Sequence, residues 1–327
     1  LGETESAFIS LQYQENGQWT NGQSTEIDPL SRTATWRIPN WNANTDHRYR
    51  VVYGKDEYTG VIRRDPVEKD AVVVAGFTGN QDTGFPNLEI TKNVGIQDPD
   101  VLFFSGDQIY EGVGGYGIIR DGVERPVLNY LRKWYLLGWS FGDLMRDRVT
   151  ICLPDDHDVY QGNIWGEGGA AMQGGNTSTD GGYIQHPDFI NAVHRTQTSH
   201  HPDIPDPKPI LQNITPFHGH MVYGRVSFAL IADRMFKTGP QAVATWEGRA
   251  DHLKDPAYDV TQLDKPELEL LGRRQEKFLE DWVQDWRGAD FKSLLSQTIF
   301  VNLANYHGGN QEFIYADLDS NGWPQTP

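Results

Sequence analysis

Hydrophobic and polar positions follow two different patterns along the chain, and the change comes near residue 66. Before it, the stretches SAFISLQYQENGQWT, TATWRIPNW and HRYRVVYG alternate apolar and polar residues at period two, with Asn-Gly pairs at the turns. This alternation is typical of half-buried strands joined by tight hairpins. Residues 1–66 are therefore predicted to form a separate β module, with too few strands for a self-sufficient sandwich.

Beyond residue 66 the apolar runs are short and continuous, as in strands that are buried on both faces of a sheet. These runs cover residues 71–75, 101–104, 149–153, 225–231 and 297–303. Between them, PVLNYLRKWYLLGWSFGDLM and LLGRRQEKFLEDWVQDW carry apolar residues at helical spacing, which predicts amphipathic helices. The alternation of strands and helices predicts an α/β domain over residues 67–327.

Two of the predicted strands end abruptly in acidic residues. GDQIYE follows the first and carries Asp107 and Tyr110, and DDHD follows the second and carries Asp156, His157 and Asp158. In α/β sheets, ligands bind beyond the carboxyl ends of the strands, and carboxylates gathered there repel one another unless a cation lies between them. The alternative is ordinary turn chemistry. Three carboxylates around one imidazole favour a metal site.

The order strand–GDQIYE, helices, strand–PDDHDVYQGN resembles the binuclear metallophosphoesterases of the calcineurin-like superfamily, and more narrowly their PhoD-like (alkaline phosphatase D) branch. The Asp233-Arg234 pair at the end of a strand and the helix LLGRRQEKFLEDWVQDW fit the same branch. The resemblance covers nearly the whole chain. It implies a four-layer α/β/β/α sandwich with an N-terminal appendage like an immunoglobulin or fibronectin type III domain. It also implies metal-dependent hydrolysis of phosphate monoesters or diesters.

The resemblance further implies two metal ions, bridged by Asp107, with Asp156 as a ligand of the second. Asn80 stands where the family places a ligand after its first strand, although an Asn in a Gly-rich turn is the simpler alternative. A Tyr110 phenolate suits a hard ion such as Fe³⁺, and oxygen donors suit Ca²⁺, with Zn²⁺ or Mn²⁺ as further options. His307 follows a strand where the superfamily has a metal-binding histidine.

The same resemblance assigns roles in the reaction. Two metals would lower the pKa of a bridging water and yield a hydroxide nucleophile. His157 would protonate the leaving group or stabilise charge, and Asp158 would orient its imidazole. Arg234 is expected to bind a phosphate oxygen, with a structural Asp–Arg pair as the alternative. Arg195 or His194 is expected to contact the substrate.

Composition narrows the list of partners. The formal charge of −17 argues against tight binding to a nucleic-acid backbone or to an anionic membrane. No apolar run approaches the length of a membrane span, and the lone Cys152 cannot form an intrachain disulfide. The expected partner is a small phosphate ester. The resemblance implies a periplasmic or secreted location.

Two points stay open in the sequence. The chain ends in DSNGWPQTP without the Gly-Asp-x-His motif of the family, so a further segment or a second chain is expected to complete the site. An alternative function is a non-catalytic surface protein that binds carbohydrate or phosphate. Its acidic loops would hold Ca²⁺, and its tryptophans would form the binding platforms.

Overall fold

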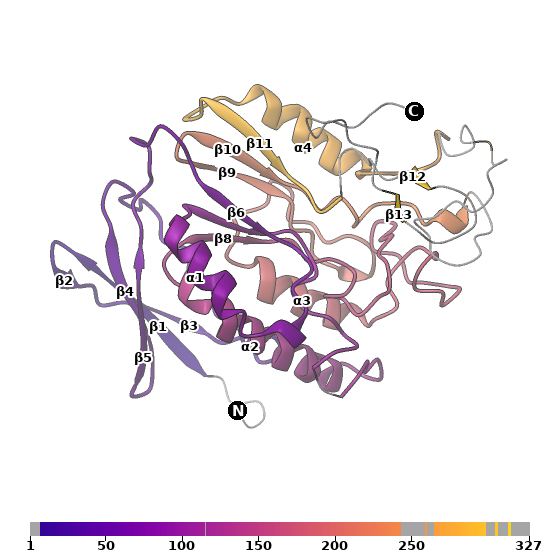
Figure 1. The fold of residues 1–327 in the computed structure, drawn as a ribbon, viewed down its shortest axis with the longest axis horizontal. Coiled ribbons are helices and arrows are strands. Elements are labelled where there is room, and N and C mark those ends of the chain that lie inside the picture. Colours follow the sequence, from indigo (N-terminus) through magenta and orange to yellow (C-terminus); the bar gives the residue numbers. More distant parts are fainter. Residues whose placement is uncertain are drawn as a thin grey trace.

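The computed structural model describes residues 7–114, 116–242, 259, 265–298, 305–306 and 313–314. It shows a mixed α/β fold with several sheets (Figure 1). None of the helices that it describes is both long and apolar enough to cross a lipid bilayer.

The N-terminal strands form one antiparallel sheet. These strands are β1 (Phe8–Glu15), β2 (Gln18–Trp19), β3 (Gln23–Glu26), β4 (His47–Tyr53) and β5 (Asp56–Ile62). Their order is β2-β1-β4-β5, and β3 also pairs with β1. Asn16 and Gly17 both have positive φ between β1 and β2, which is the conformation that a two-residue Asn-Gly hairpin turn requires.

The stretch TATWRIPNW was predicted as a strand, and this prediction is wrong: it has no regular secondary structure. Its side chains instead cover other elements. The Trp36 indole donates a hydrogen bond to the Gln23 carbonyl, and the Trp41 ring lies 4.4 Å from the ring of His47. Pro39, which lacks an N–H, also disfavours strand pairing here. The alternation in this stretch reflects packing of a loop rather than pairing of a strand.

The first parallel sheet consists of β6 (Val74–Phe77), β7 (Val101–Phe104) and β8 (Val149–Cys152), in the order β6-β7-β8. Helices α1 (Leu88–Gln97) and α2 (Glu124–Met145) connect these strands. One face of α2 packs on this sheet in a cluster formed by Leu102, Phe104, Leu137, Phe141, Leu144 and Cys152. The continuous apolar runs of β7 and β8 are therefore covered, as predicted for strands buried on both faces.

The second sheet has the order β11-β10-β9 and contains β9 (Gly219–Tyr223), β10 (Val226–Leu230) and β11 (Phe291–Leu295). Its inner side chains pack against those of the first sheet in a cluster that includes Val101, Ile151, Phe228, Leu230 and Leu295. On its other face, Phe278 of α4 (Gly272–Gln284) packs on Ala229 and Ile231. The two sheets thus face each other, with α1 and α2 on one side and α4 on the other (Figure 1).

The remaining elements are α3 (Pro187–Thr198), the 3-10 helices η1 (Asp82–Gly84), η2 (Leu211–Asn213) and η3 (Pro240–Ala242), and the short pair β12 (Asn305–Tyr306) and β13 (Phe313–Ile314). The helix α3 packs beside α2 through Phe189, Ile190 and Val193. The strand predicted at residues 297–303 falls mostly outside the described residues, and β11 lies just before that range. Gln297 and Thr298 lie outside β11, and residues 299–303 are not among those described. β11 itself was not predicted, because polar Lys292 and Ser293 interrupt its apolar residues.

Candidate metal centre

The loop after β7 turns sharply, because Gly106 and Asp107 both have positive φ (134° and 54°). A Cβ atom on Gly106 would lie only 2.7 Å from the Cβ of Asp155, so only glycine fits between this loop and the one after β8. The two loops therefore lie against each other at the carboxyl ends of neighbouring parallel strands. This is where α/β sheets place their ligands.

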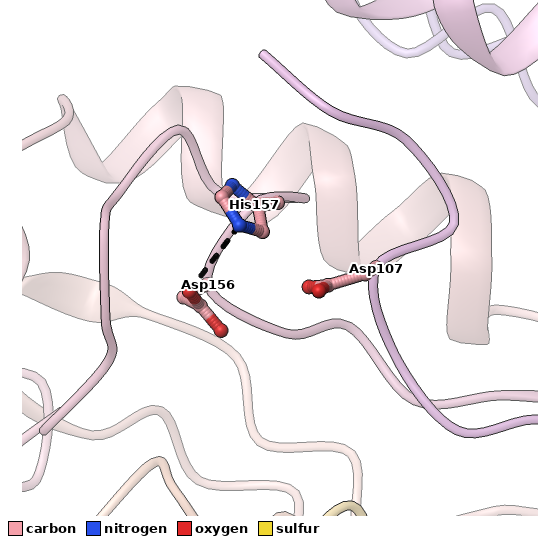
Figure 2. Close-up of side chains that lie close together, drawn as sticks. All are labelled: Asp107, Asp156 and His157. Atoms are coloured by element: carbon pink, nitrogen blue, oxygen red, sulfur yellow. Dashed lines mark ion pairs between the residues drawn. The ribbon is translucent and has the colours of Figure 1, made fainter. Parts of the chain in front are cut away.

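Three side chains from these loops converge on one point. One ligand atom each from Asp107, Asp156 and His157 lies within 4.8 Å of the other two. Figure 2 shows Asp107 reaching from the loop after β7 toward Asp156 and His157 on the loop after β8. The two converging carboxylates suit a divalent or trivalent cation, and the imidazole of His157 lies beside them.

The hydrogen bonding of Asp107 supports a cation at this point. Its Oδ1 atom is buried and has no hydrogen-bond partner among the described residues, and such orphaned atoms are rare in folded proteins. Burial and the neighbouring Asp155 carboxylate raise the pKa of Asp107 to about 6. A bound metal ion would relieve both the missing contact and the repulsion. The residues present therefore fit a metal.

His157 is held by a carboxylate that was not singled out in the sequence. Its Nδ1 atom lies 2.6 Å from Oε2 of Glu111, and its Nε2 atom lies 4.0 Å from Oδ2 of Asp156. Burial lowers the pKa of this imidazole, but the hydrogen bond and charge of Glu111, with Asp107 and Asp156, outweigh burial and bring it to about 9. Glu111 is the last letter of GDQIYE, so the motif contained the signal.

Asp158 was expected to orient the imidazole of His157, but its carboxylate oxygens accept hydrogen bonds from other groups. The residue is fully buried, and its two carboxylate oxygens accept five N–H groups from the surrounding chain. The donors are the amides of Asp155, Asp107, Gln108 and Ile109 and the side chain of Gln197, at 2.9, 3.0, 3.1, 3.3 and 3.0 Å respectively. Asp158 thereby fastens the loops after β7 and β8 to each other and to α3.

Asn80 and Tyr110 lie beside Asp107, where ligands were expected. The Asn80 amide donates to the Asp107 carbonyl at 2.9 Å, and its side-chain Nδ2 is buried without a partner among the described residues. The Tyr110 hydroxyl donates to Oδ2 of Asp107 at 3.0 Å, and its ring centroid lies 4.3 Å from that of His157, with the two rings tilted by 37°. Burial and the nearby carboxylates raise the pKa of Tyr110 well above its usual value. Their role as ligands stays a prediction.

A buried lysine donates hydrogen bonds to the backbone of the same loop. Lys133 of α2 is 1% exposed, and its Nζ donates to the carbonyls of Glu111 and Tyr110 at 2.5 and 3.3 Å. The ammonium also lies over the Tyr160 ring. Helical periodicity assigned the apolar side chains of α2 to the core and gave no sign that a lysine would be buried among them.

Arg234 is directed into the acidic cluster. Its Nη1 donates to Oδ1 of Asp155 at 2.5 Å and to Oδ1 of Asp156 at 2.7 Å. The alternative, a structural Asp–Arg pair, is formed with Asp155 and Asp156, whereas the adjacent Asp233 accepts hydrogen bonds from Thr298 N and Ser296 Oγ. Arg234 balances charge next to the centre, which is compatible with a contact to an anionic substrate.

The other expected site residues lie elsewhere. His194 is buried on α3 and donates from Nδ1 to the Thr215 carbonyl, and Arg195 donates from Nε to the Thr33 hydroxyl. Neither is among the residues that converge with Asp107. His307 lies outside the described residues, so its assignment as a ligand stays a prediction.

Comparison with known proteins gives one informative likeness. No protein-family model and no curated protein matches the chain. A solved structure titled "Structure of PhoD" matches with a TM-score of 0.64 and 17% sequence identity, over 93% of this chain and 57% of the PhoD chain. The chain thus spans little more than half the length of that protein. The resemblance that GDQIYE and DDHD predicted is confirmed at the level of the fold: this chain has a PhoD-like fold.

Proposed function

We propose that this chain hydrolyses phosphate esters with the help of bound metal ions. The observation that carries the proposal is the convergence of Asp107, Asp156 and His157 at the ends of β7 and β8, with Oδ1 of Asp107 left without a partner among the described residues. The PhoD-like fold supports it, because the sequence motifs of the alkaline phosphatase D branch fall on the residues that converge. The physiological substrate would be a small phosphomonoester or phosphodiester.

Asp107 and Asp156 would hold the ions, with Asn80 and Tyr110 as further ligands. Oxygen donors suit Fe³⁺ and Ca²⁺, with Mn²⁺ also possible, whereas Zn²⁺ is less favoured because it prefers nitrogen and sulfur donors. Bound cations supply Lewis acidity that polarises the phosphoryl group and activates a water. Asp158 would keep the metal ligands in position, because it accepts hydrogen bonds from the backbone of both loops.

His157 would act on the leaving group. Glu111 accepts the Nδ1 proton, and this hydrogen bond leaves the Nε2 proton directed toward the centre. Despite burial, the hydrogen bond and charge of Glu111 raise the pKa of His157, which favours the protonated ring that a general acid requires. Arg234 would offset the charge of the phosphate beside Asp155 and Asp156.

We also infer that the two facing sheets and their helices form a four-layer α/β/β/α sandwich over residues 67–327. The clusters between the sheets, and between each sheet and its helices, support this arrangement. Residues 1–66 would be an appended β module. It contacts the catalytic part where the Tyr49 hydroxyl donates to the Arg146 carbonyl and the Val61 amide to Asp147.

The test is turnover of p-nitrophenyl phosphate and bis-p-nitrophenyl phosphate by the purified chain. The protein is stripped with a chelator and reloaded with Fe³⁺, Ca²⁺, Zn²⁺ or Mn²⁺ separately. We expect chelation to abolish turnover and at least one ion to restore it. If chelation only lowers the melting temperature of a protein with no turnover, the chain is a calcium-binding surface protein instead.

A further inference from the structure

A cavity of about 540 Å³ lies between α3 and the proline-rich segment 202–217. Its wall includes side chains from three parts of the chain: Arg37, His194, Arg195, Thr198, His201 and Pro209. Asp107, Asp156 and His157 are not among its described lining residues, so it is separate from the candidate metal centre. Its volume falls within the roughly 300–1,000 Å³ that is usual for small-molecule sites.

One residue of the cavity wall, His201, has a ring nitrogen without a hydrogen-bond partner among the described residues. His201 is 5% exposed, and its Nε2 accepts the Cys152 amide of β8 at 3.1 Å. Nε2 is therefore unprotonated, and the ring proton sits on Nδ1. This Nδ1 is buried and has no partner among the residues that the structure describes. A buried donor without an acceptor is costly, and His201 lines the cavity, so an acceptor bound there would relieve this cost.

Two arginines line the same cavity as His201. Arg37 donates from Nη2 to the carbonyls of Ser199 and His201, at 3.0 and 3.1 Å, and these bonds fix its guanidinium on the turn that carries the histidine. Arg195 follows His194 on α3 and donates from Nε to the Thr33 hydroxyl at 3.1 Å. Both side chains are about half exposed, at 51% and 43%.

Acidic neighbours neutralise these arginines only in part. Asp203 lies 2.9 Å from Nε of Arg37, and Asp28 lies 3.7 Å from Nε of Arg195. Both contacts involve Nε. Within the described part of the chain, Nη1 of Arg37 and both Nη atoms of Arg195 make no hydrogen bond. In a protein of formal charge −17, a cavity with two such guanidinium groups is a local exception.

We propose that this cavity is a second, non-catalytic binding site for a small oxyanion, a molecule that carries a carboxylate or phosphate group. The anion accepts hydrogen bonds from His201 Nδ1 and from the free guanidinium nitrogens of Arg37 and Arg195. Charge-assisted bonds of this kind are among the stronger ones in proteins. The proline side chains of the cavity wall would pack against a short organic part.

The experiment uses the full chain carrying Asp107→Asn, with a chelator present, so that the candidate metal centre does not take up the probe. Inorganic phosphate and acetate are titrated separately by calorimetry, which distinguishes the two sources of the oxyanion. In parallel, the imidazole Nδ1–H resonance of His201 is followed in nitrogen-15-labelled protein. We expect one-to-one binding of at least one anion and a shift of that resonance.

Matched variants test the contacts. Arg37→Gln and Arg195→Gln should each weaken binding by on the order of tenfold, the usual loss for one charge-assisted hydrogen bond. Arg273→Gln removes an exposed arginine that pairs with Glu280 away from the cavity, and should leave binding unchanged. The proposal is overturned if neither anion gives heat or shifts the His201 resonance. It is also overturned if binding persists at full strength in both cavity variants. Because the resonance is followed with Arg37 and Arg195 intact, this readout stands even where one arginine variant fails to fold.

Discussion

The segments that follow β7 and β10 place similar aspartates in different surroundings. Each strand is followed, three residues later, by an aspartate: Asp107 after Phe104 and Asp233 after Leu230. Asp233 accepts hydrogen bonds from Thr298 N at 3.0 Å and Ser296 Oγ at 3.2 Å. On Asp107, the Tyr110 hydroxyl reaches one oxygen, and the other has no partner among the described residues.

The difference comes from what the neighbouring strand delivers. Next to β10, the segment after β11 brings backbone N–H and hydroxyl donors, which satisfy the carboxylate. Next to β7, the loop after β8 brings further carboxylates, including Asp155. Burial raises the pKa of Asp107 most, and the charge of Asp155 raises it further. An aspartate after a strand is thus ordinary structure when donors surround it. It indicates a cation site when other carboxylates do.

The largest effect is expected from Asp107→Asn. The amide keeps the shape but removes the charge, so metal content should fall and turnover should drop by roughly 10³-fold or more. Stability should hold or rise, because a buried and repelled charge is removed. Metal analysis, turnover and urea unfolding check the three parts. Full metal content with normal turnover would sink the proposed centre.

His157→Ala comes next. The variant should keep its metals while kcat falls by on the order of 10²- to 10⁴-fold, the usual range for a general acid. Substrates with good leaving groups should suffer less. Glu111→Gln should give a smaller loss, roughly 10- to 100-fold, with the same dependence on the leaving group. Loss of metal in His157→Ala would make this histidine a ligand, and equal losses for all substrates would point to charge stabilisation.

Much of this site was predictable because it lies where continuous apolar runs end. The runs before Asp107 and Asp156 are buried on both faces, so they are readable without knowledge of the partner strands. β11 was not predicted, because Lys292 and Ser293 interrupt its apolar run at the end of the described sheet. Edge strands carry a weaker pattern, since part of their surface faces water.

The separate roles of the four residues in DDHD could not be predicted from the sequence, for a different reason. Its four polar residues follow one another in a tight turn, and composition does not say which side chain points inward. The backbone path turns Asp158 into the core, where five N–H groups meet it, and turns His157 toward Glu111. Most of these partners lie far from DDHD in the sequence, and one, the Asp155 amide, lies on the same turn. The sequence alone does not show which of them each side chain meets.

Asp158→Ala should therefore act on stability first. It leaves five donors in the core without an acceptor, and the loss is expected to be about 3–5 kcal/mol, as for the removal of one partner from a buried charged network. Asp158→Asn retains one acceptor oxygen and should lose less. Urea unfolding measures both. A change below about 1 kcal/mol for the alanine variant would show that this carboxylate does not hold the two loops together.

Buried histidines give a pH dependence of stability. Burial lowers the pKa of His194, despite its bond to the Thr215 carbonyl, and the pKa of His218, each to about 4. As the pH falls from 6.5 to 4, the unfolded chain binds protons that the folded imidazoles do not, so stability falls by up to a few kcal/mol per histidine. His194→Gln keeps a donor but cannot titrate, and its stability should fall less over this window. Identical slopes for both proteins would contradict this.

The smallest effect is expected from Asp233→Asn, and it tests the comparison most directly. The new amide would keep a carbonyl oxygen for Thr298 N but lose the charge that strengthens the contacts with Thr298 and Ser296, at a cost of about 1 kcal/mol. Metal content and turnover should stay at the level of the unmodified protein, because this carboxylate is already satisfied by the chain. Metal analysis beside Asp107→Asn makes the contrast quantitative. If Asp233→Asn also loses metal, Asp233 belongs to the same centre as Asp107. In that case, hydrogen bonds from neighbouring donors do not show that an aspartate is structural and not a metal ligand.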